Sequence, residues 1–211
     1  MIKLYFKQGA CSLATHITLR EAGLPFEIEK VTDGKTASGE EYASINPKGY
    51  VATIELDDGS ILTENAAILP YIADLVPGKN LAPKYGTMER VRMSEWLAFA
   101  NSELHPNIAR LAFPSTTLHA DDKEKVMKKL TKYFGILDLH LKGKEWLAGD
   151  SFTVADVYTF VVTNWMMQFK VLENFAAWPN LAKYLERIGE RPKVKEAIKA
   201  EAGPAKQVCE V

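Results

Sequence analysis

The hydrophobic pattern of the sequence changes once along the chain, across a segment that is rich in proline and glycine. Residues 77–86 show little periodicity, which is typical of a linker. Two prolines and two glycines punctuate this segment: Pro77, Gly78, Pro83 and Gly86. Short apolar runs alternate with helical patterns before it, whereas only helical patterns follow it. We therefore predict two domains, residues 1–76 and residues 87–211, joined by a linker over residues 77–86.

The first domain is predicted to be an α/β domain with the element order β-α-β-α-β-β-α. Apolar residues 2–6 and 26–31 predict two strands, and residues 11–22 between them predict a helix. Because a helix separates the two strands, we expect them to be parallel. A short helical turn, a hairpin over residues 51–62 and a helix over residues 65–75 complete this order.

The stretch NPKGYVATIELDDGSILTENAAIL, residues 46–69, is compatible with two interpretations. Its hairpin turn falls at Asp57, Asp58 and Gly59, and Asn65 begins a helix soon after the second strand. A strand that enters beside a helix N-terminus offers backbone hydrogen bonds and unpaired helix N–H groups, which together suit a ligand with a carboxylate. A buried hairpin without any ligand explains the same residues.

The second domain is predicted to be a bundle of helices. Five segments have helical periodicity: residues 88–111, 121–141, 153–169, 179–188 and 194–200. In SFTVADVYTF, Thr153 and Asp156 have the spacing of a capping box, which we interpret as a folding signal rather than as a catalytic one. Gly203 and Pro204 end the last helix, and Cys209 behind them is predicted to be an exposed thiol.

The composition is that of a globular protein, and it excludes several classes of function. Of the 211 residues, 47% are hydrophobic, and 26 basic residues almost balance 27 acidic ones. A general nucleic-acid binder or a polybasic membrane surface needs a basic excess, so we expect neither nucleic acid nor membrane as a partner. The opening MIKLYF lacks the apolar core of a signal peptide, and no apolar run is long enough to span a bilayer, which predicts a cytoplasmic protein.

Cysteine and histidine usage narrows the chemistry further. Two cysteines, Cys11 and Cys209, are too few for a disulfide framework and fit a reducing compartment. No metal site is predicted, because no histidine has a second ligand at the spacing of a helical metal site. The four histidines are His16, His105, His119 and His140.

Cys11 is a candidate reactive thiol. It follows a strand and a loop and lies at the first turn of a predicted helix, where the helix dipole and unpaired N–H groups favour a thiolate. A dithiol motif needs a second cysteine three residues on, but Ala14 stands there, so a redox cycle requires a second thiol from outside. A buried cysteine that serves as a small apolar residue is the alternative. Ser12 and Tyr5 are candidate hydrogen-bond donors to a bound thiolate, and Tyr5 is also a candidate substrate-binding residue, although the position of Tyr5 favours a core tyrosine.

His105 is a second candidate catalytic residue. In SELHPNIARL it is followed directly by Pro106, which disfavours a helical conformation at His105 and predicts a kink or an end of the long helix there. A kink that faces the other domain places the imidazole in a cleft. A structural histidine is the alternative.

A series of short motifs runs through nearly the whole length of the chain. They are KLYF with GACSL, LREAGL, INPKG, DDGSILTE, YIADL, EWL, SELH, FTVADVY and YLERIGERP. Each motif is weak by itself, but in their order and spacing the chain resembles glutathione transferases, and most closely the bacterial beta class. The resemblance implies a thioredoxin-like domain followed by a helical domain, usually assembled as a homodimer, with glutathione as co-substrate and no metal.

The resemblance also implies roles for individual residues. Cys11 matches the cysteine beside the glutathione sulfur, and Lys35 matches a lysine that reaches the glycine carboxylate of the tripeptide. The backbone of Val51 is expected to pair with the cysteinyl part. Glu64 and Asn65 match the positions that hold the γ-glutamyl group. His105 matches a histidine that faces the electrophile.

Two positions depart from the family pattern. The family has a cis-proline after the residue that corresponds to Val51, and Ala52 stands at this glutathione-binding position. After His105, the beta class often has lysine where this chain has Pro106. Because Ala52 stands in place of this proline, the sequence does not decide whether the protein binds glutathione.

Three hypotheses for function follow. The leading one is a transferase that adds the glutathione thiolate to small apolar electrophiles, as in detoxification. The second is a glutathione-dependent thiol-disulfide reductase in which Cys11 is the nucleophile. The third is a non-catalytic module that binds a protein partner, which the substitution at Ala52 motivates.

Overall fold

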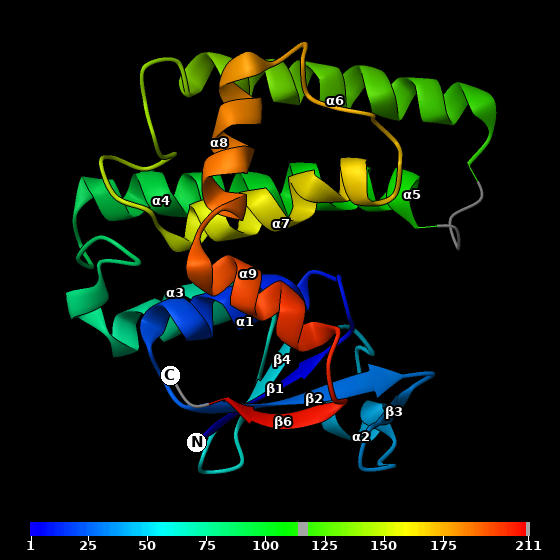
Figure 1. The fold of residues 1–211 in the computed structure, drawn as a ribbon, viewed down its shortest axis with the longest axis vertical. Coiled ribbons are helices and arrows are strands. Elements are labelled where there is room, and N and C mark those ends of the chain that lie inside the picture. The colour runs from blue at the N-terminus through cyan, green and yellow to red at the C-terminus, as the bar shows by residue number, and fades with distance from the viewer. Residues whose placement is uncertain (114–117, 210–211) are drawn as a thin grey trace. The chain divides into compact units, whose positions relative to one another are not determined.

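The computed structural model describes residues 1–113 and 118–209, and it divides the chain into two compact units (Figure 1). Unit 1 consists of Met1–Ala82 and Arg191–Val211, and unit 2 consists of Pro83–Glu190. The first boundary between the units, at Ala82 and Pro83, therefore falls within the segment that was predicted as a linker. No helix in the described ranges is both long enough and apolar enough to cross a bilayer.

Unit 1 is built around a mixed sheet in which β1 is central. The strands are β1 (Ile2–Phe6), β2 (Phe26–Thr32), β3 (Lys35–Thr36), β4 (Thr53–Glu55), β5 (Ile61–Thr63) and β6 (Lys206–Cys209). Their order is β3-β2-β1-β4-β5, and β6 also pairs with β2. As predicted, β1 and β2 are parallel, with Ile2 opposite Phe26, because a helix connects them. The remaining pairs in the sheet are antiparallel.

Helices cover the sheet of unit 1 because each has an apolar face to bury. They are α1 (Ser12–Ala22), α2 (Tyr42–Ile45), α3 (Asn65–Leu75) and α9 (Pro192–Glu201), and a short 3₁₀ turn, η1 (Pro77–Lys79), follows α3. Helix α1 packs against both α3 and α9, and the three lie on the same side of the sheet (Figure 1). Leu4 and Phe6 on β1, Ile17 on α1 and Ile68 on α3 are fully buried in the core. A hydrogen bond from Asn65 to the Cys11 carbonyl joins the starts of α3 and α1, and the Cys11 thiol bonds to Val51 shortly before β4.

The end of the chain corrects one prediction. Residues 87–211 were assigned to one helical domain, but α9 and β6 belong to unit 1, and β6 extends its sheet with Cys209 opposite Phe26. Four residues of mixed polarity gave no clear strand signal. Cys209 was predicted to be exposed, but it is 4% exposed, because the strand pairing turns its thiol toward α1.

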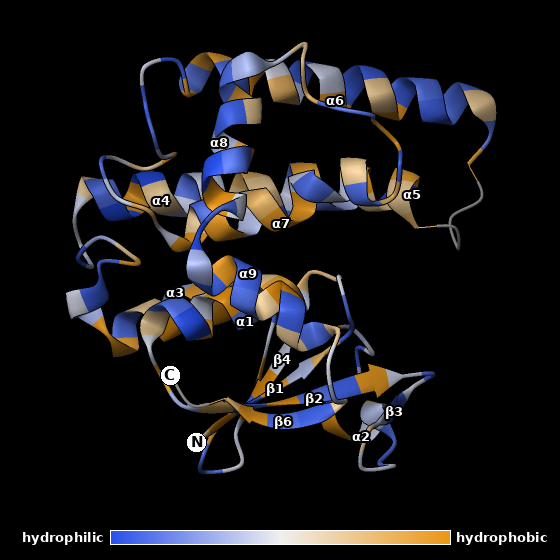
Figure 2. Cartoon of the chain, in the orientation of Figure 1, coloured by the Kyte–Doolittle hydropathy of each residue, from blue (hydrophilic) through white to orange (hydrophobic). Residues whose placement is uncertain are grey.

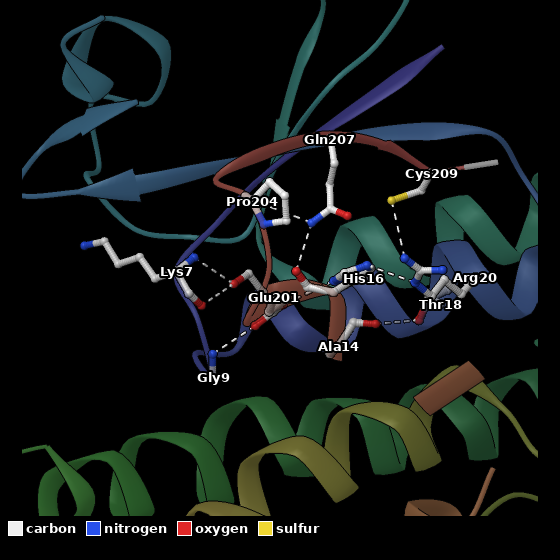
Figure 3. A network of polar contacts seen from close by, with 12 residues as sticks. Lys7, Gly9, Ala14, His16, Thr18, Arg20, Glu201, Pro204, Gln207 and Cys209 are labelled. Carbon is white, nitrogen blue, oxygen red and sulfur yellow. Dashed lines mark hydrogen bonds and ion pairs between the residues drawn. The ribbon is translucent and has the colours of Figure 1, made fainter. Parts of the chain in front are cut away.

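Polar contacts fasten this last segment to α1 (Figure 3). Glu201 is buried at the end of α9, and its carboxylate accepts hydrogen bonds from the backbone N–H of Gly9 and contacts Nδ1 of His16 at 3.3 Å. Arg20 donates to Nε2 of His16 and, from its other end, to Sγ of Cys209. Burial lowers the pKa of His16, although the adjacent carboxylate opposes this shift.

Unit 2 consists of helices. They are α4 (Met88–Phe99), η2 (Ala100–Leu104), α5 (His105–Ala112), α6 (Ala120–His140), α7 (Val154–Gln168) and α8 (Pro179–Gly189). Helix α7 is buried on nearly all sides, whereas α6 buries only one face, and Figure 2 shows the corresponding difference in hydropathy. The fully buried aromatic side chains Phe134, Tyr158, Trp165 and Tyr184 make up much of this core.

The predicted capping box is present at the start of α7. Asp156 accepts hydrogen bonds from the backbone N–H and hydroxyl of Thr153, and also from the Leu147 backbone and the Tyr184 hydroxyl. Burial raises the pKa of Asp156, and these hydrogen bonds oppose the shift. The box thus anchors α7 to the loop before it and to α8, which agrees with a folding role.

The long helix predicted over residues 88–111 is interrupted by a π-helical turn. The N–H of His105 bonds to the carbonyl of Ala100, five residues back, instead of four. Pro106 explains this widening, since its ring has no N–H and clashes with the carbonyl that lies four residues before it in a regular helix. The helix therefore continues through His105 by way of an irregular turn, instead of ending there.

Candidate active site

Cys11 occupies the N-cap position of α1, at the end of a closed loop. The Ser12 hydroxyl, which is fully buried, accepts from the Lys7 N–H and donates to the Lys7 carbonyl, both at 3.2 Å. Ser12 was predicted to donate to a bound thiolate. In the structure its proton is committed to Lys7, so Ser12 shapes the loop that carries Cys11.

The thiol of Cys11 is protonated in this environment. It donates a hydrogen bond to the carbonyl oxygen of Val51 at 2.9 Å. Burial raises the pKa of Cys11 to about 12; the backbone N–H groups at the start of α1 lower it, while the negative charge of Glu64 raises it further. The expectation that the helix start favours a thiolate is therefore wrong, because desolvation of the thiolate outweighs the helix N–H groups.

The loop that presents Val51 is held by a buried polar network. Asn46 donates to the carbonyl of Tyr50 at 2.7 Å and to the hydroxyl of Thr53 at 3.0 Å. The hydroxyl of Tyr42 reaches the same two groups, at 2.9 and 2.6 Å. The Val51–Ala52 peptide bond that follows Tyr50 is cis. The network fixes the direction of the backbone at Val51, whose carbonyl oxygen accepts the hydrogen bond from the Cys11 thiol.

Asn65 connects the start of α3 to the start of α1. Its side-chain N–H donates to the carbonyl of Cys11 at 2.9 Å, and its side-chain oxygen accepts from the Thr15 hydroxyl at 2.7 Å. Asn65 is 4% exposed, so both bonds are shielded from water. The two helix N-termini therefore lie side by side, which concentrates partial positive charge between them.

Glu64, directly before Asn65, is exposed and has an unusual backbone conformation. Its φ of 74° lies in the left-handed region, which residues with a side chain rarely adopt and which is common at functional sites. Its carboxylate pairs with Lys48 at 2.9 Å, and Lys48 also donates to the hydroxyl of Thr63. This ion pair holds the Glu64 carboxylate at the protein surface.

Two predicted site residues have other partners. Tyr5 was expected to reach a bound thiolate or substrate, but its hydroxyl donates to Glu55 at 2.6 Å, and its ring packs in a buried cluster with Val31 and Tyr42. Burial and this carboxylate raise the pKa of Tyr5. Lys35 is exposed on β3 and forms an ion pair with Glu41 at 3.1 Å.

His105 lies in unit 2, at the start of α5. Its Nδ1 is 2.6 Å from the hydroxyl of Tyr158, and its ring packs edge-on against Trp165 with a centroid distance of 5.1 Å. Phe113 packs against the same tryptophan at 5.0 Å. The imidazole is thus part of an aromatic wall.

The structure brings Cys11, Val51, Ala52, Glu64 and Asn65 together in unit 1. Several supporting residues were not identified from the sequence: Thr15, Tyr42, Asn46, Lys48 and Thr53. Two of them lie in the INPKG motif, which was the available signal for the loop. Within residues 1–113 and 118–209, no group of three acidic, histidine or cysteine side chains is placed to hold a metal ion.

Two family models match the chain. The model described as "Glutathione S-transferase, N-terminal domain" matches residues 9–75, and the model described as "Glutathione S-transferase, C-terminal domain" matches residues 101–192. The chain is also similar to the glutathione S-transferase GstA of Escherichia coli O157:H7. The two are 38% identical over 202 residues, which cover 95% of this chain and 98% of GstA.

Solved structures show the same similarity. A sphingomonad glutathione S-transferase complexed with glutathione is 40% identical, with a TM-score of 0.88, over 96% of this chain and 100% of that one. A bacterial beta class glutathione S-transferase from Sphingomonas chungbukensis is 42% identical, with a TM-score of 0.87, over 94% of this chain and 98% of that one. These similarities confirm the predicted fold and the predicted resemblance.

Proposed function

The chain belongs to the glutathione S-transferase family, and we propose how its residues carry out glutathione transfer. It is a glutathione-dependent transferase, and glutathione is its co-substrate. The observation that carries the proposal is the cluster in which Cys11 donates to Val51 while Asn65 binds the Cys11 backbone. This cluster combines a backbone edge, two helix N-termini and a thiol.

Glutathione is proposed to lie across this cluster. Its cysteinyl part pairs with the backbone of Val51 next to Ala52, where the buried network fixes the loop. Its γ-glutamyl carboxylate binds at the start of α3, where backbone N–H groups and Asn65 meet, and its amino group is placed near the Glu64 carboxylate. Lys35 reaches the glycine carboxylate, and its exposed pairing with Glu41 costs little to break.

Cys11 is proposed to act as a hydrogen-bond donor to the glutathione sulfur. Its raised pKa leaves very little of the thiol ionised at pH 7, which makes Cys11 a poor nucleophile. A protonated thiol stabilises the glutathione thiolate without competing with it. The glutathione thiolate then forms a carbon–sulfur bond with an electrophilic carbon. In a substitution, the electron pair of the broken bond leaves with the departing group. In an addition, the displaced π-electron pair remains on the carbon skeleton. This favours transfer over the disulfide chemistry of the reductase hypothesis.

The electrophile is proposed to be small and apolar, and the reaction is proposed to serve detoxification. The family resemblance implies that His105 faces the electrophile, and in unit 2 the ring of His105 packs against Trp165, which Phe113 also contacts. His105 acts on the electrophile side of the reaction. Apolar and aromatic side chains are the usual lining of such sites, with few polar groups for orientation.

The protein is proposed to be a cytoplasmic homodimer. Both described cysteines are free thiols, which suits a reducing compartment. Met88 and Val91 lie three residues apart on α4 and are 64% and 55% exposed, so they present an apolar stripe that a second copy can cover. Light scattering of the Met88→Ser/Val91→Ser variant tests this; a wild-type protein that is monomeric at micromolar concentration contradicts it.

One pair of measurements tests the proposed function. Calorimetric titration of the reduced protein with glutathione is expected to show one site per chain, in the micromolar to millimolar range. Turnover with a set of activated aryl halides and enones is expected to depend on glutathione. Folded protein that binds glutathione but transfers it to none of these compounds overturns the proposal and favours a non-catalytic, partner-binding module.

A further inference from the structure

The carboxylate of Glu201 is buried between the loop after β1 and the middle of α1. Glu201 ends α9 and is 2% exposed. One of its oxygens accepts from the backbone N–H of Gly9 at 2.9 Å, and the other lies 3.3 Å from Nδ1 of His16 (Figure 3). Gly9 and Glu201 are 192 positions apart, so the last helix of the chain reaches back to its first loop.

Side chains of α1 fix the direction of this carboxylate. The Nε–H of Arg20 can only donate, and it lies 3.0 Å from Nε2 of His16, so Nε2 accepts this hydrogen. Burial lowers the pKa of His16, which leaves a neutral imidazole at pH 7 with its single proton on Nδ1. That proton is donated to Glu201. Each oxygen of the carboxylate therefore accepts from one donor.

The loop over residues 7–10 receives the other contact of Glu201. Two hydrogen bonds between Lys7 and Ser12 close the ends of this loop. Gly9, inside the loop, has a φ of 68°, in the left-handed region that favours glycine. Glu201 therefore ties the middle of the loop to α9, whereas Ser12 ties its ends together.

The position of this loop determines where Cys11 lies. Cys11 follows two residues after Gly9, its carbonyl accepts from Asn65, and its thiol donates to Val51. The proposed glutathione site depends on both of these contacts. If the loop is released at Gly9, Cys11 is free to move away from both partners, and the site loses its arrangement.

We propose that Glu201 is a positioning residue for the glutathione site, which acts through Gly9 on the loop that leads to Cys11. Docking of the C-terminal segment, α9 and β6, onto α1 then favours glutathione binding, and glutathione binding favours docking by the same factor. This coupling rests on the proposed function, whereas the hold on the loop concerns the free protein alone.

Two substitutions of Glu201 test the positioning role. In Glu201→Met, which removes both acceptors, glutathione is expected to bind about tenfold more weakly in a calorimetric titration, as for loss of one hydrogen bond to a charged group. The KM for an activated aryl halide, at saturating glutathione, is expected to change less than about twofold. Glu201→Gln has one accepting oxygen for two donors, so intermediate binding is expected. General loss of stability does not produce this selective, graded effect.

Two controls change the C-terminal segment without touching the loop. Glu196→Gln removes another carboxylate of α9, which pairs with Arg20. Gln207→Leu removes hydrogen bonds to the carbonyls of Ala200 and Pro204, which hold the turn before β6. Both variants are expected to bind glutathione within about twofold of wild type, even where urea unfolding shows a lower stability.

Hydrogen exchange of the wild-type protein tests the coupling without any substitution. Saturating glutathione is expected to slow exchange of the β6 amides about tenfold, because reciprocity links this factor to the loss of affinity in Glu201→Met. In Glu201→Met, glutathione is expected to change these rates less than about twofold. Without glutathione, the Gly9 amide is expected to exchange about tenfold faster in Glu201→Met than in wild type.

The outcomes separate the inference from the proposed function. If the wild-type protein binds glutathione and folded Glu201→Met binds it equally well, the inference is overturned and the proposed function stands. Exchange of β6 that glutathione leaves unchanged in wild type also overturns the coupling. If Glu201→Met does not fold, Glu201→Gln and the wild-type exchange decide. If the wild-type protein does not bind glutathione, the proposed function and the coupling both fail, and the Gly9 amide decides whether Glu201 holds the loop.

Discussion

The starts of α1 and α5 each carry a candidate catalytic residue, but the surroundings of these two residues differ. At the start of α1, Cys11 is partly buried and its thiol donates to the backbone carbonyl of Val51, and its raised pKa retains the proton. At the start of α5, His105 meets the hydroxyl of Tyr158 through Nδ1, and its ring packs edge-on against Trp165. The comparison teaches that a helix start alone does not set reactivity, because the partners of the side chain differ from one helix start to the other.

The largest effect is expected from the alkylation rate of Cys11 as a function of pH. Because only the thiolate reacts and the pKa is about 12, the rate is expected to rise about tenfold per pH unit, or about a thousandfold from pH 7 to pH 10. Iodoacetamide labelling, read by peptide mass spectrometry, measures Cys11 apart from Cys209. Circular dichroism at each pH checks that the protein remains folded. A rate that levels off near pH 8.5 contradicts the assigned proton and removes the contrast with His105.

The next largest effect is expected from His105→Gln. Loss of the imidazole is expected to lower kcat by about a hundredfold, as is typical for an acid–base residue, with little change in the KM for glutathione. Steady-state kinetics with an activated electrophile provide the measurement. His119→Gln is a matched control, since His119 is not part of the wall. A variant within twofold of wild type would falsify the proposed role of His105.

Asn65→Ala is expected to have an intermediate effect on the α1 side. It leaves the Thr15 hydroxyl and the Cys11 carbonyl without their partner, which costs about 1–3 kcal/mol of unfolding free energy. It also releases the two helix starts from each other, so glutathione is expected to bind about tenfold more weakly, or about 1.4 kcal/mol. Urea unfolding and calorimetry measure the two quantities.

Asn65→Asp is the informative companion to this change. It retains the acceptor for Thr15 and loses the donor to Cys11. Stability near wild type with weakened glutathione binding isolates the contact to Cys11. Unchanged binding in both variants shows that the helix starts do not form the glutathione site.

The smallest effect is expected from Cys11 itself. Cys11→Ala removes one neutral donor to the glutathione sulfur, so kcat is expected to fall about three- to tenfold, in line with about 1 kcal/mol for one hydrogen bond. Cys11→Ser keeps a donor and is expected to recover most of the rate. If both variants lose all transfer, Cys11 is a nucleophile after all, and its role as a hydrogen-bond donor is wrong.

Local signals in the sequence predicted a large part of the fold. The helix that begins at Asn65, the turn at Gly59 and the capping box of Thr153 and Asp156 each depend on neighbours in the chain, and the structure contains all three. Pro106 marked the position of an irregularity, although the π-helical form it takes also depends on contacts with α6 and α7. Short strands such as β6 have too few residues to show the alternation of apolar and polar side chains that predicts a strand.

The chemistry of the site was harder to predict, because it depends on residues far apart in the sequence. The helix position of Cys11 favours a thiolate, yet its pKa is set by burial that involves the loop at Val51, 40 residues away. From the sequence, Tyr5 is a candidate hydrogen-bond donor to a ligand, but in the structure its hydroxyl donates to Glu55 on the neighbouring strand. The contact between His105 and Tyr158 joins residues that are 53 positions apart, and no spacing rule connects them.

The pairing of β6 with β2 has a consequence for how the protein is made. Residues at both extremes of the numbering share one sheet, and Glu201 fastens the loop that leads to Cys11. A ribosome synthesises the residues before α9 and β6 first. Until these last elements are made, β2 lacks its pairing with β6, and the Gly9 N–H lacks the Glu201 carboxylate. Unit 2, which is continuous in sequence, can form in the meantime. Because Glu201 is made after most of the chain, we expect the loop that leads to Cys11 to reach its folded form late in synthesis.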